Sequence, residues 1–249
     1  MLDENGSFKR DDDLLEQAYK KYARDGLRVS RWRLWLRFMI KKNAWMVVLE
    51  GSRALKRLID IVGSALGLVA LSPVFGITAL LIKLEDGGPI FFSQQRVGKW
   101  GKRFQMYKFR SMIVNADKVK SELMDQNEAG GVIFKMKRDP RITRVGRVIR
   151  KLSIDELPQL YNVLKGDMSL VGPRPSLPKE VAEYTLSDRR RLEAIPGLTC
   201  LWQVSGRSDI NFEGQVRLDV QYLESQTFLG DIILLLKTIP AVLLGKGAY

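Results

Sequence analysis

The chain has 249 residues, of which 45% are hydrophobic, so it can bury a core in one domain or in two small ones. Its 41 Lys and Arg residues exceed its 28 Asp and Glu residues, and the formal net charge of +13 predicts anionic partners: nucleic acid, phospholipid or a phosphorylated substrate. Histidine is absent, which excludes Ser/His and Cys/His nucleophile systems and most zinc sites. The single cysteine, Cys200, cannot form an intramolecular disulfide, and we expect it to be buried in a protein of a reducing compartment.

The first 50 residues are expected to form a separate region. Residues 1–27 are charged and weakly periodic; they predict a mobile arm or a surface helix without an assigned function, and their start lacks the features of a signal peptide. Residues 28–49 mix Arg and Lys with apolar side chains that helical spacing gathers on one side: Trp32, Trp35, Leu36, Met39, Met46 and Val47. This pattern is typical of a helix in a membrane interface, and a helix packed on the rest of the protein is the alternative.

The run over residues 58–82, LIDIVGSALGLVALSPVFGITALLI, is almost wholly apolar. At about 1.5 Å per residue, a helix of this length crosses a hydrocarbon core of about 30 Å. Basic residues flank both ends, so the positive-inside rule favours the cytoplasmic side for both. Ser72 and Pro73 predict a break at which the chain turns back as a re-entrant hairpin, the Ser72 hydroxyl bonding to freed backbone groups. A kinked single span and a buried core helix are the alternatives.

Residues 89–112 predict a β-hairpin around Gly98-Lys99-Trp100-Gly101, followed by a helix over 115–126 and a bend at Gly130-Gly131. Arginine then recurs at every third position: 138, 141, 144, 147 and 150. If the later part is helical, Arg144, Arg147 and Lys151 share a face with Arg150 beside them. Such a face is usually solvated, but here it leads directly into an acidic pair.

The acidic pair lies in SIDELPQLYN, residues 153–162. Ser153 and Glu156 fit a capping box at a helix start, although Pro158 is unfavourable in that register and Asp155 is the better N-cap candidate. In either register the pair stands at the positive end of a helix, which is also a phosphate-binding place.

The last third of the chain predicts a Gly- and Pro-rich loop over 165–175, a helix over about 179–194, a strand over 198–206 and a second interfacial helix over 228–249. We therefore predict an α+β fold that is predominantly helical, with a short β-hairpin, in a monotopic membrane protein. Residues 1–50 form its N-terminal arm and interfacial helix, and residues 51–249 form the domain with the re-entrant helix.

A membrane-embedded hairpin, a group of arginines and an acidic pair together indicate transfer of a phosphoryl group to or from a lipid. An aspartate can attack phosphorus as a nucleophile. It must overcome repulsion from an anionic diphosphate, about 4 kcal/mol per pair of unit charges at 4 Å and an effective dielectric of 20. Arginines and Mg²⁺, a hard cation that prefers carboxylate and phosphate oxygens, supply that compensation.

The chain resembles the bacterial sugar transferase family, the monotopic polyprenyl-phosphate phosphoglycosyl transferases. The resemblance covers roughly residues 55–249 and rests on six runs in fixed order: KRLIDIVGSALGLVALSPVFGITALLIK, GGPIFFSQQRVG, YKFRSM, RDPRITRVGRVIRKLSIDELPQLYNVLKGDMSLVGPRP, PGLTCLWQVSGR and LDVQYL. It implies transfer of a sugar-1-phosphate from a UDP-sugar to undecaprenyl phosphate, with Mg²⁺, at the cytoplasmic face of the bacterial inner membrane. This is the first membrane step of surface-glycan assembly, and the sugar stays open.

The same resemblance implies roles for individual residues. Asp155 matches the nucleophile and Glu156 the Mg²⁺ ligand of the family. Phosphate-handling arginines correspond to Arg150, Arg174 and Arg207, basic positions near the site to Lys108 and Arg110, and the helix-breaking pair to Ser72 and Pro73. The first 50 residues depart from the family's long and short forms, so homo-oligomerisation and regulation stay open.

Two other classes compete with this interpretation. A basic nucleic-acid-binding protein explains the charge of +13 but neither the apolar run over 58–82 nor the DELPQ motif, so we expect no nucleic-acid partner. A noncatalytic scaffold that binds anionic lipid explains the apolar run. Such a scaffold would bind vesicles but release no nucleotide from a UDP-sugar.

Overall fold

The computed structural model describes residues 16, 20, 31–116, 118–119, 136, 139–206 and 210–244. The chain divides into two compact units, Met1–Leu55 and Lys56–Tyr249. Most of the arm predicted over 1–27, most of the helix predicted over 115–126, the bend at Gly130-Gly131 and Arg207 lie outside the described residues.

The first long helix, α2 (Arg31–Ala70), is continuous. The separate helix expected over 28–49 is therefore wrong in its boundary, because no proline interrupts the run and the helix tolerates Gly51. The side chains of Trp35, Leu36 and Ile40 are exposed, and their position in a membrane interface stays a prediction.

The break predicted at Ser72-Pro73 is confirmed. Helix α3 (Ser72–Asp86) begins there, and the segments Glu50–Ala70 and Ser72–Asp86 meet at 58°. Pro73 has no N–H to donate to the carbonyl of Val69, and the Ser72 hydroxyl donates to that oxygen instead, at 2.8 Å. Among the described residues no single helix is long and apolar enough to span a membrane, whereas this bent pair is when taken together.

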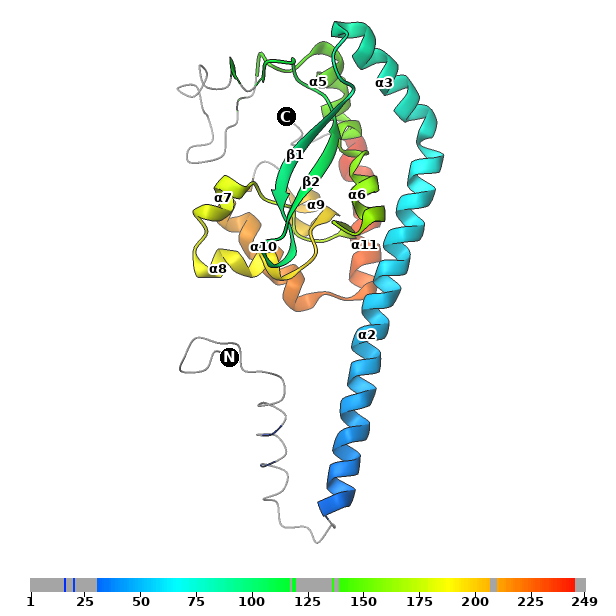
Figure 1. Ribbon diagram of the computed structural model, residues 1–249, viewed down its shortest axis with the longest axis vertical. Helices are drawn as coiled ribbons and strands as arrows, with labels where there is room; N and C mark the ends of the chain where they lie inside the picture. The colour runs from blue at the N-terminus through cyan, green and yellow to red at the C-terminus, as the bar shows by residue number, and fades with distance from the viewer. Residues whose placement is uncertain are drawn as a thin grey trace. The chain divides into compact units, whose positions relative to one another are not determined.

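The predicted hairpin is also confirmed. Strands β1 (Phe91–Val97) and β2 (Arg103–Phe109) pair antiparallel, joined by the turn Lys99–Gly101. Figure 1 shows the hairpin beside α6 (Gln159–Lys165), with which β2 is in contact. Along β2, Phe104 and Met106 are buried while the residues between them are not, as expected for a strand with one face on a core.

A second sheet was not predicted. Strands β3 (Ser169–Val171) and β4 (Gly197–Thr199) pair in parallel, and a Cβ on Gly197 would lie 2.0 Å from the backbone nitrogen of Gly172. Both strands have only three residues, so they carry no alternating pattern. Their pairing depends on this close approach of two glycines far apart in the sequence.

Two predictions for the last third of the chain were wrong. The helix expected over 179–194 is divided into α7 (Pro178–Ala182), α8 (Leu186–Arg189) and η4 (Arg190–Glu193), because Thr185 and Asp188 form a capping box that starts a new helix. The strand expected over 198–206 ends at Thr199 and gives way to α9 (Leu201–Ser205). Helices α10 (Phe212–Ser225) and α11 (Phe228–Leu244) follow; the second confirms a helix where one was predicted.

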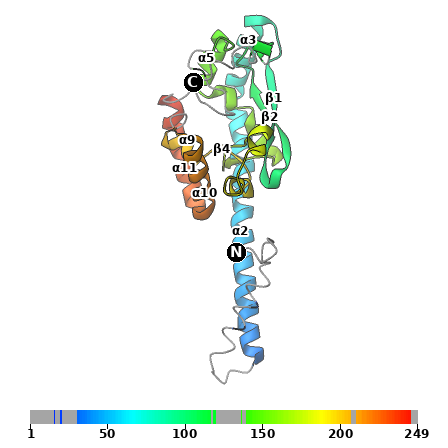
Figure 2. The ribbon, with the colours of Figure 1, turned by 90° about the vertical axis from the view of Figure 1, so that its left-hand side faces the viewer.

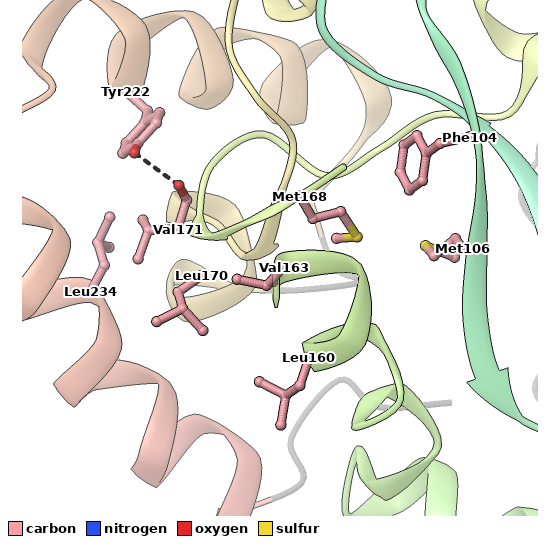
Figure 3. Close-up of a cluster of buried hydrophobic side chains, with 9 residues drawn as sticks. All are labelled: Phe104, Met106, Leu160, Val163, Met168, Leu170, Val171, Tyr222 and Leu234. Atoms are coloured by element: carbon pink, nitrogen blue, oxygen red, sulfur yellow. Dashed lines mark hydrogen bonds between the residues drawn. The ribbon is translucent and has the colours of Figure 1, made fainter. Parts of the chain in front are cut away.

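The main hydrophobic core joins these pieces (Figure 3). Its buried side chains come from the hairpin, α6, the parallel sheet, α10 and α11: Phe104, Met106, Leu160, Val163, Met168, Leu170, Val171, Tyr222 and Leu234. The Tyr222 hydroxyl donates to the Val171 carbonyl at 3.1 Å, so the one polar atom of this ring is satisfied. Figure 2 shows α9, α10 and α11 gathered on one side of β4, with the hairpin on the other.

Candidate active site

Helix α5 (Arg144–Lys151) brings the arginine run towards the acidic pair. Its N-terminus is capped by the Thr143 side chain, which accepts from the Gly146 N–H at 2.9 Å. A carboxylate oxygen of Glu85, near the end of α3, accepts from the N–H groups of Arg144 and Val145 at 2.7 and 3.2 Å. The predicted face is confirmed as solvated, since Arg144, Arg147 and Lys151 are exposed. Only the last arginine of the helix, Arg150, is half-buried at the end that leads into the pair.

The acidic pair does not cap a helix, which corrects the expectation from sequence. Ser153 lies in the left-handed region at φ 54°, and Ile154–Glu156 form one 3₁₀ turn. Helix α6 begins only at Gln159, after Pro158, and no side chain caps it. Proline delays the helix beyond the reach of both cap candidates, so the two carboxylates of Asp155 and Glu156 are available to other partners.

Glu156 is held by two cations from different elements. Its Oε1 accepts from Lys108 Nζ on β2 at 2.7 Å and from Arg174 Nη2 in the GPRP loop at 2.6 Å. Burial alone would raise the pKa of Glu156, but the charges of Arg174 and Lys108 outweigh it and hold the pKa well below its usual range. The carboxylate of Glu156 in turn raises the pKa of Arg174. Glu156 is therefore ionised at neutral pH.

Asp155 has a different environment. Its side chain is buried, and its Oδ2 lies 4.0 Å from Lys108 Nζ. Burial raises the pKa of Asp155 and the charge of Glu156 adds to this, while the charges of Lys108, Arg150 and Arg174 oppose it. A poorly solvated carboxylate that shares its neighbouring cations with a stronger competitor is suited to nucleophilic attack.

The other predicted site residues are placed differently. Arg150 acts on Asp155 through its charge. Arg110 is instead paired with Asp86 at the end of α3, Nη1 donating to Oδ2 at 2.8 Å, and this pair holds the pKa of Asp86 below its usual range. Its role in phosphate binding stays a prediction, as does that of Arg207, which lies outside the described residues.

Sequence reasoning missed Arg96 on β1. Its Nη1 donates to the carbonyl of Pro175, next to Arg174, at 3.2 Å, and its Nη2 donates to Gln94 Oε1 at 2.8 Å. Burial and the charge of Arg174 lower the pKa of Arg96 to about 10, so it stays charged at neutral pH. The sequence offered only one weak signal, a charged residue in a hairpin strand, which is usually a solvated position.

The cations around the acidic pair outnumber its carboxylates. Lys108, Arg150 and Arg174 face Asp155 and Glu156, and the charge of Arg96 also acts on Glu156. A surplus of positive charge in a partly buried site attracts an anion such as a phosphate or diphosphate. In the described part of the chain no three acidic or cysteine side chains converge as a metal cage. The residues fit Mg²⁺ only in the way typical of phosphate substrates, with one carboxylate and phosphate oxygens as ligands.

Comparisons with known proteins identify the family of the chain. The model of the family described as bacterial sugar transferase matches residues 51–245. The chain is 50% identical over 197 residues to a galactosyl transferase, CpsE, of Streptococcus agalactiae, with 78% of the chain covered. It is 49% identical over 205 residues to the undecaprenyl-phosphate galactose phosphotransferase of Salmonella typhimurium, with 80% of the chain covered.

The matched lengths of these relatives differ. The match spans 43% of the CpsE protein and 43% of the Salmonella protein. It spans 88% of the exopolysaccharide production protein ExoY of Sinorhizobium fredii, to which the chain is 43% identical over 198 residues, 78% of its own length. The matched residues contain the acidic pair and all its described cations, and the chain belongs to the bacterial sugar transferase family.

Proposed function

We propose that this protein transfers a sugar-1-phosphate from a UDP-sugar to undecaprenyl phosphate in the assembly of a surface polysaccharide or glycoconjugate. The observation that carries the proposal is the acidic pair with its surplus of cations: Lys108 and Arg174 both donate hydrogen bonds to Glu156, whereas Oδ2 of Asp155 lies 4.0 Å from Lys108 Nζ. Family membership and relatives named for galactose transfer support the class of reaction.

In this proposal Asp155 is the nucleophile. A carboxylate oxygen attacks the phosphorus attached to the sugar, the bond from that phosphorus to the oxygen bridging to UMP breaks, and UMP leaves with the electron pair. An oxygen of undecaprenyl phosphate then attacks the same phosphorus and releases the Asp155 carboxylate. Arg174 and Lys108 offset charge on the phosphoryl group in flight, and Arg150 favours the ionised form of Asp155.

Glu156 is the residue that would hold Mg²⁺, and Lys108 and Arg174 show that its carboxylate already serves as a partner for cations. When bound, the ion would supply further neutralisation of the diphosphate. Glu156 also orients Lys108 and Arg174 through the hydrogen bonds that it accepts from them.

The test is a lipid-free exchange experiment. Wild-type enzyme mixed with UDP-galactose and labelled UMP should move the label into UDP-galactose, and its intact mass should rise by one sugar phosphate. Asp155→Asn keeps the shape of the side chain but loses the nucleophile, so both signals should disappear. Other UDP-sugars, screened in the same way with undecaprenyl phosphate present, identify the sugar.

The control is Asp188→Asn, a carboxylate in the capping box of α8, which should exchange as the wild type does. A wild-type enzyme that transfers sugar phosphate to lipid but neither exchanges label nor gains mass contradicts the covalent step. Direct attack by the lipid phosphate would give that result.

We further propose that α2 and α3 form a re-entrant hairpin in the inner membrane, entered from the cytoplasmic face. The bent pair is lined by exposed apolar side chains: Leu58, Leu66, Val69, Ile77, Leu80 and Leu84. Contact of these apolar side chains with water is unfavourable, and the hydrocarbon core of a membrane would remove that contact.

Cysteine labelling tests the topology. In a Cys200→Ser background, a cysteine at Arg53 or at Glu85 should resist a membrane-impermeant reagent added to whole cells, since both flanks would face the cytoplasm. Reaction of one flank alone would show a true span. Pro73→Leu restores the missing backbone N–H and removes the ring that breaks the helix, so it should favour the span.

A further inference from the structure

The loop that carries Arg174 is fastened to strand β1. The Val97 N–H donates to the Ser176 carbonyl at 2.9 Å, and the two residues form an isolated antiparallel bridge. One residue earlier on each side, Arg96 Nη1 donates to the Pro175 carbonyl at 3.2 Å. Arg96 is itself oriented by Gln94, whose Oε1 accepts from Nη2 at 2.8 Å. A side chain and a backbone group of β1 thus donate hydrogen bonds to the two residues that follow Arg174.

The place of Arg96 is unfavourable for an arginine that merely fills space. Its Nε is buried and has no hydrogen-bond partner among the described residues. Burial and the like charge of Arg174 both lower its pKa. A second guanidinium next to Arg174 therefore lowers the folding stability. Residues that lower stability are common at functional sites, where function requires a particular arrangement of side chains.

The far side of the loop is held separately. The Ser176 hydroxyl accepts from the Tyr184 hydroxyl at 2.6 Å, and Arg191 Nη1 donates to that tyrosine at 3.1 Å. Arg191 is paired in turn with Asp219 on α10. Because this buried chain fixes Ser176 without Arg96, loss of the Arg96 side chain should leave the loop in place and change only the part that carries Arg174.

We propose that Arg96 is a positioning residue for phosphoryl transfer: it holds the Pro175 carbonyl, and by its like charge it keeps the Arg174 guanidinium turned away from β1 and towards Glu156 and the phosphate. This role rests on the proposed function. Arg96 acts through Arg174, so it affects the rate only as long as Arg174 is present.

A double-mutant cycle tests this dependence. Arg96→Gln should lower kcat/KM for the UDP-sugar by about tenfold, mostly in kcat, because one hydrogen bond and one charge that orient Arg174 are lost. Adding Arg96→Gln to Arg174→Gln should lower the rate no further. Arg96→Lys keeps the charge and one donor, so it should recover part of the loss. Gln94→Ala, which loosens Arg96 without touching its charge, should have a smaller effect of the same kind.

Arg103→Gln is the matched control, since Arg103 lies opposite Val97 on β2 and is exposed. Arg103→Gln should match the wild type in rate, and the Arg96 variants should melt no lower than the wild type. Losses that add in the double variant would overturn the proposal, because Arg96 would then act on the substrate by itself. An Arg96→Gln rate equal to that of Arg103→Gln would also overturn it. A wild-type enzyme without turnover contradicts the proposed function instead, so the two failures are distinguishable.

Discussion

Two carboxylate–arginine contacts in the unit Lys56–Tyr249 differ in how many cations face each carboxylate. At the acidic pair, Glu156 accepts hydrogen bonds from both Arg174 and Lys108, so two cations face this carboxylate. At α10, Asp219 is paired with one cation among the described residues, Arg191. The pair Asp219–Arg191 is the more deeply buried, at 0% and 5% exposure. Deeper burial of a carboxylate–arginine pair is therefore no sign of a candidate active site here.

The surroundings of the two contacts explain the difference. Arg191 lies over the rings of Tyr184 and Phe212, with centroids 5.8 and 5.9 Å from its Cζ, so aromatic faces fill the space where a ligand would bind. Burial raises the pKa of Asp219 to about 6 although Arg191 opposes it, whereas two cations keep the pKa of Glu156 low. The surplus of cations at Glu156 favours binding of an anionic ligand, whereas the Asp219–Arg191 pair is already neutral.

Removing the carboxylate of Glu156 should give the largest effect. Glu156→Gln should lower turnover by roughly 10³-fold, because Lys108 and Arg174 lose the group that orients them and the proposed metal ligand is lost. Initial rates of UMP release, measured over a range of Mg²⁺ concentrations, check this, and added Mg²⁺ should restore little. Glu183→Gln, an exposed carboxylate at the end of α7, is the control. A rate within a few-fold of the wild type would show that Glu156 has neither role.

Mutation of the Asp219–Arg191 pair should change the stability of the protein. Asp219→Ala removes the hydrogen-bond acceptor as well as the counter-ion of the buried Arg191 and should lower the free energy of unfolding by about 3 kcal/mol. The control is Glu224→Gln on the same helix, whose pair with Arg190 at 2.9 Å is exposed and should contribute less than about 1 kcal/mol. Denaturant unfolding measures both. The comparison fails if Asp219→Ala is as stable as Glu224→Gln but loses turnover, since Asp219 would then belong to the active site.

Local causes explain which parts of the fold the sequence could predict. The bend at Ser72-Pro73 and the hairpin around Gly98–Gly101 follow from backbone chemistry within a few residues, and both are confirmed. The parallel pairing of β3 with β4 depends on Gly172 meeting Gly197, which no local pattern reveals. The expected cap at Asp155 failed for a local reason, because Pro158 delays the start of α6 to Gln159, beyond the reach of the Asp155 side chain.

The site was predictable only as far as motifs reached. Lys108 and Arg174 match family positions and meet at Glu156, but sequence could not show that Arg110 is paired with Asp86. Nor could it find Arg96, whose part in the site arises from the pairing of β1 with the loop after Arg174. The sequence of a short hairpin strand does not reveal whether a charged side chain on it is solvated or covered by a neighbouring loop.

The smallest expected effect is a pH dependence of the Asp219–Arg191 pair. An aspartate in the unfolded chain titrates near its model value of 3.8, whereas the folded pKa of Asp219 is about 6. Between these values the folded state binds the proton more tightly, so this group's contribution to stability is full below the lower pKa and is lost as pH rises through the upper one. The slope is at most about 1.4 kcal/mol per pH unit.

Because other groups also titrate, the quantity to measure is the difference in unfolding free energy between the wild type and Asp219→Ala. The variant cannot titrate at this position, so the difference should widen as pH falls from 7 to 4 and become flat below. Glu224→Gln should show no such widening, because Asp219 is intact in that variant and its contribution cancels in the difference. A difference that narrows on acidification would mean that Arg191 holds Asp219 ionised throughout, and the contrast with Glu156 would then rest on the number of cations alone.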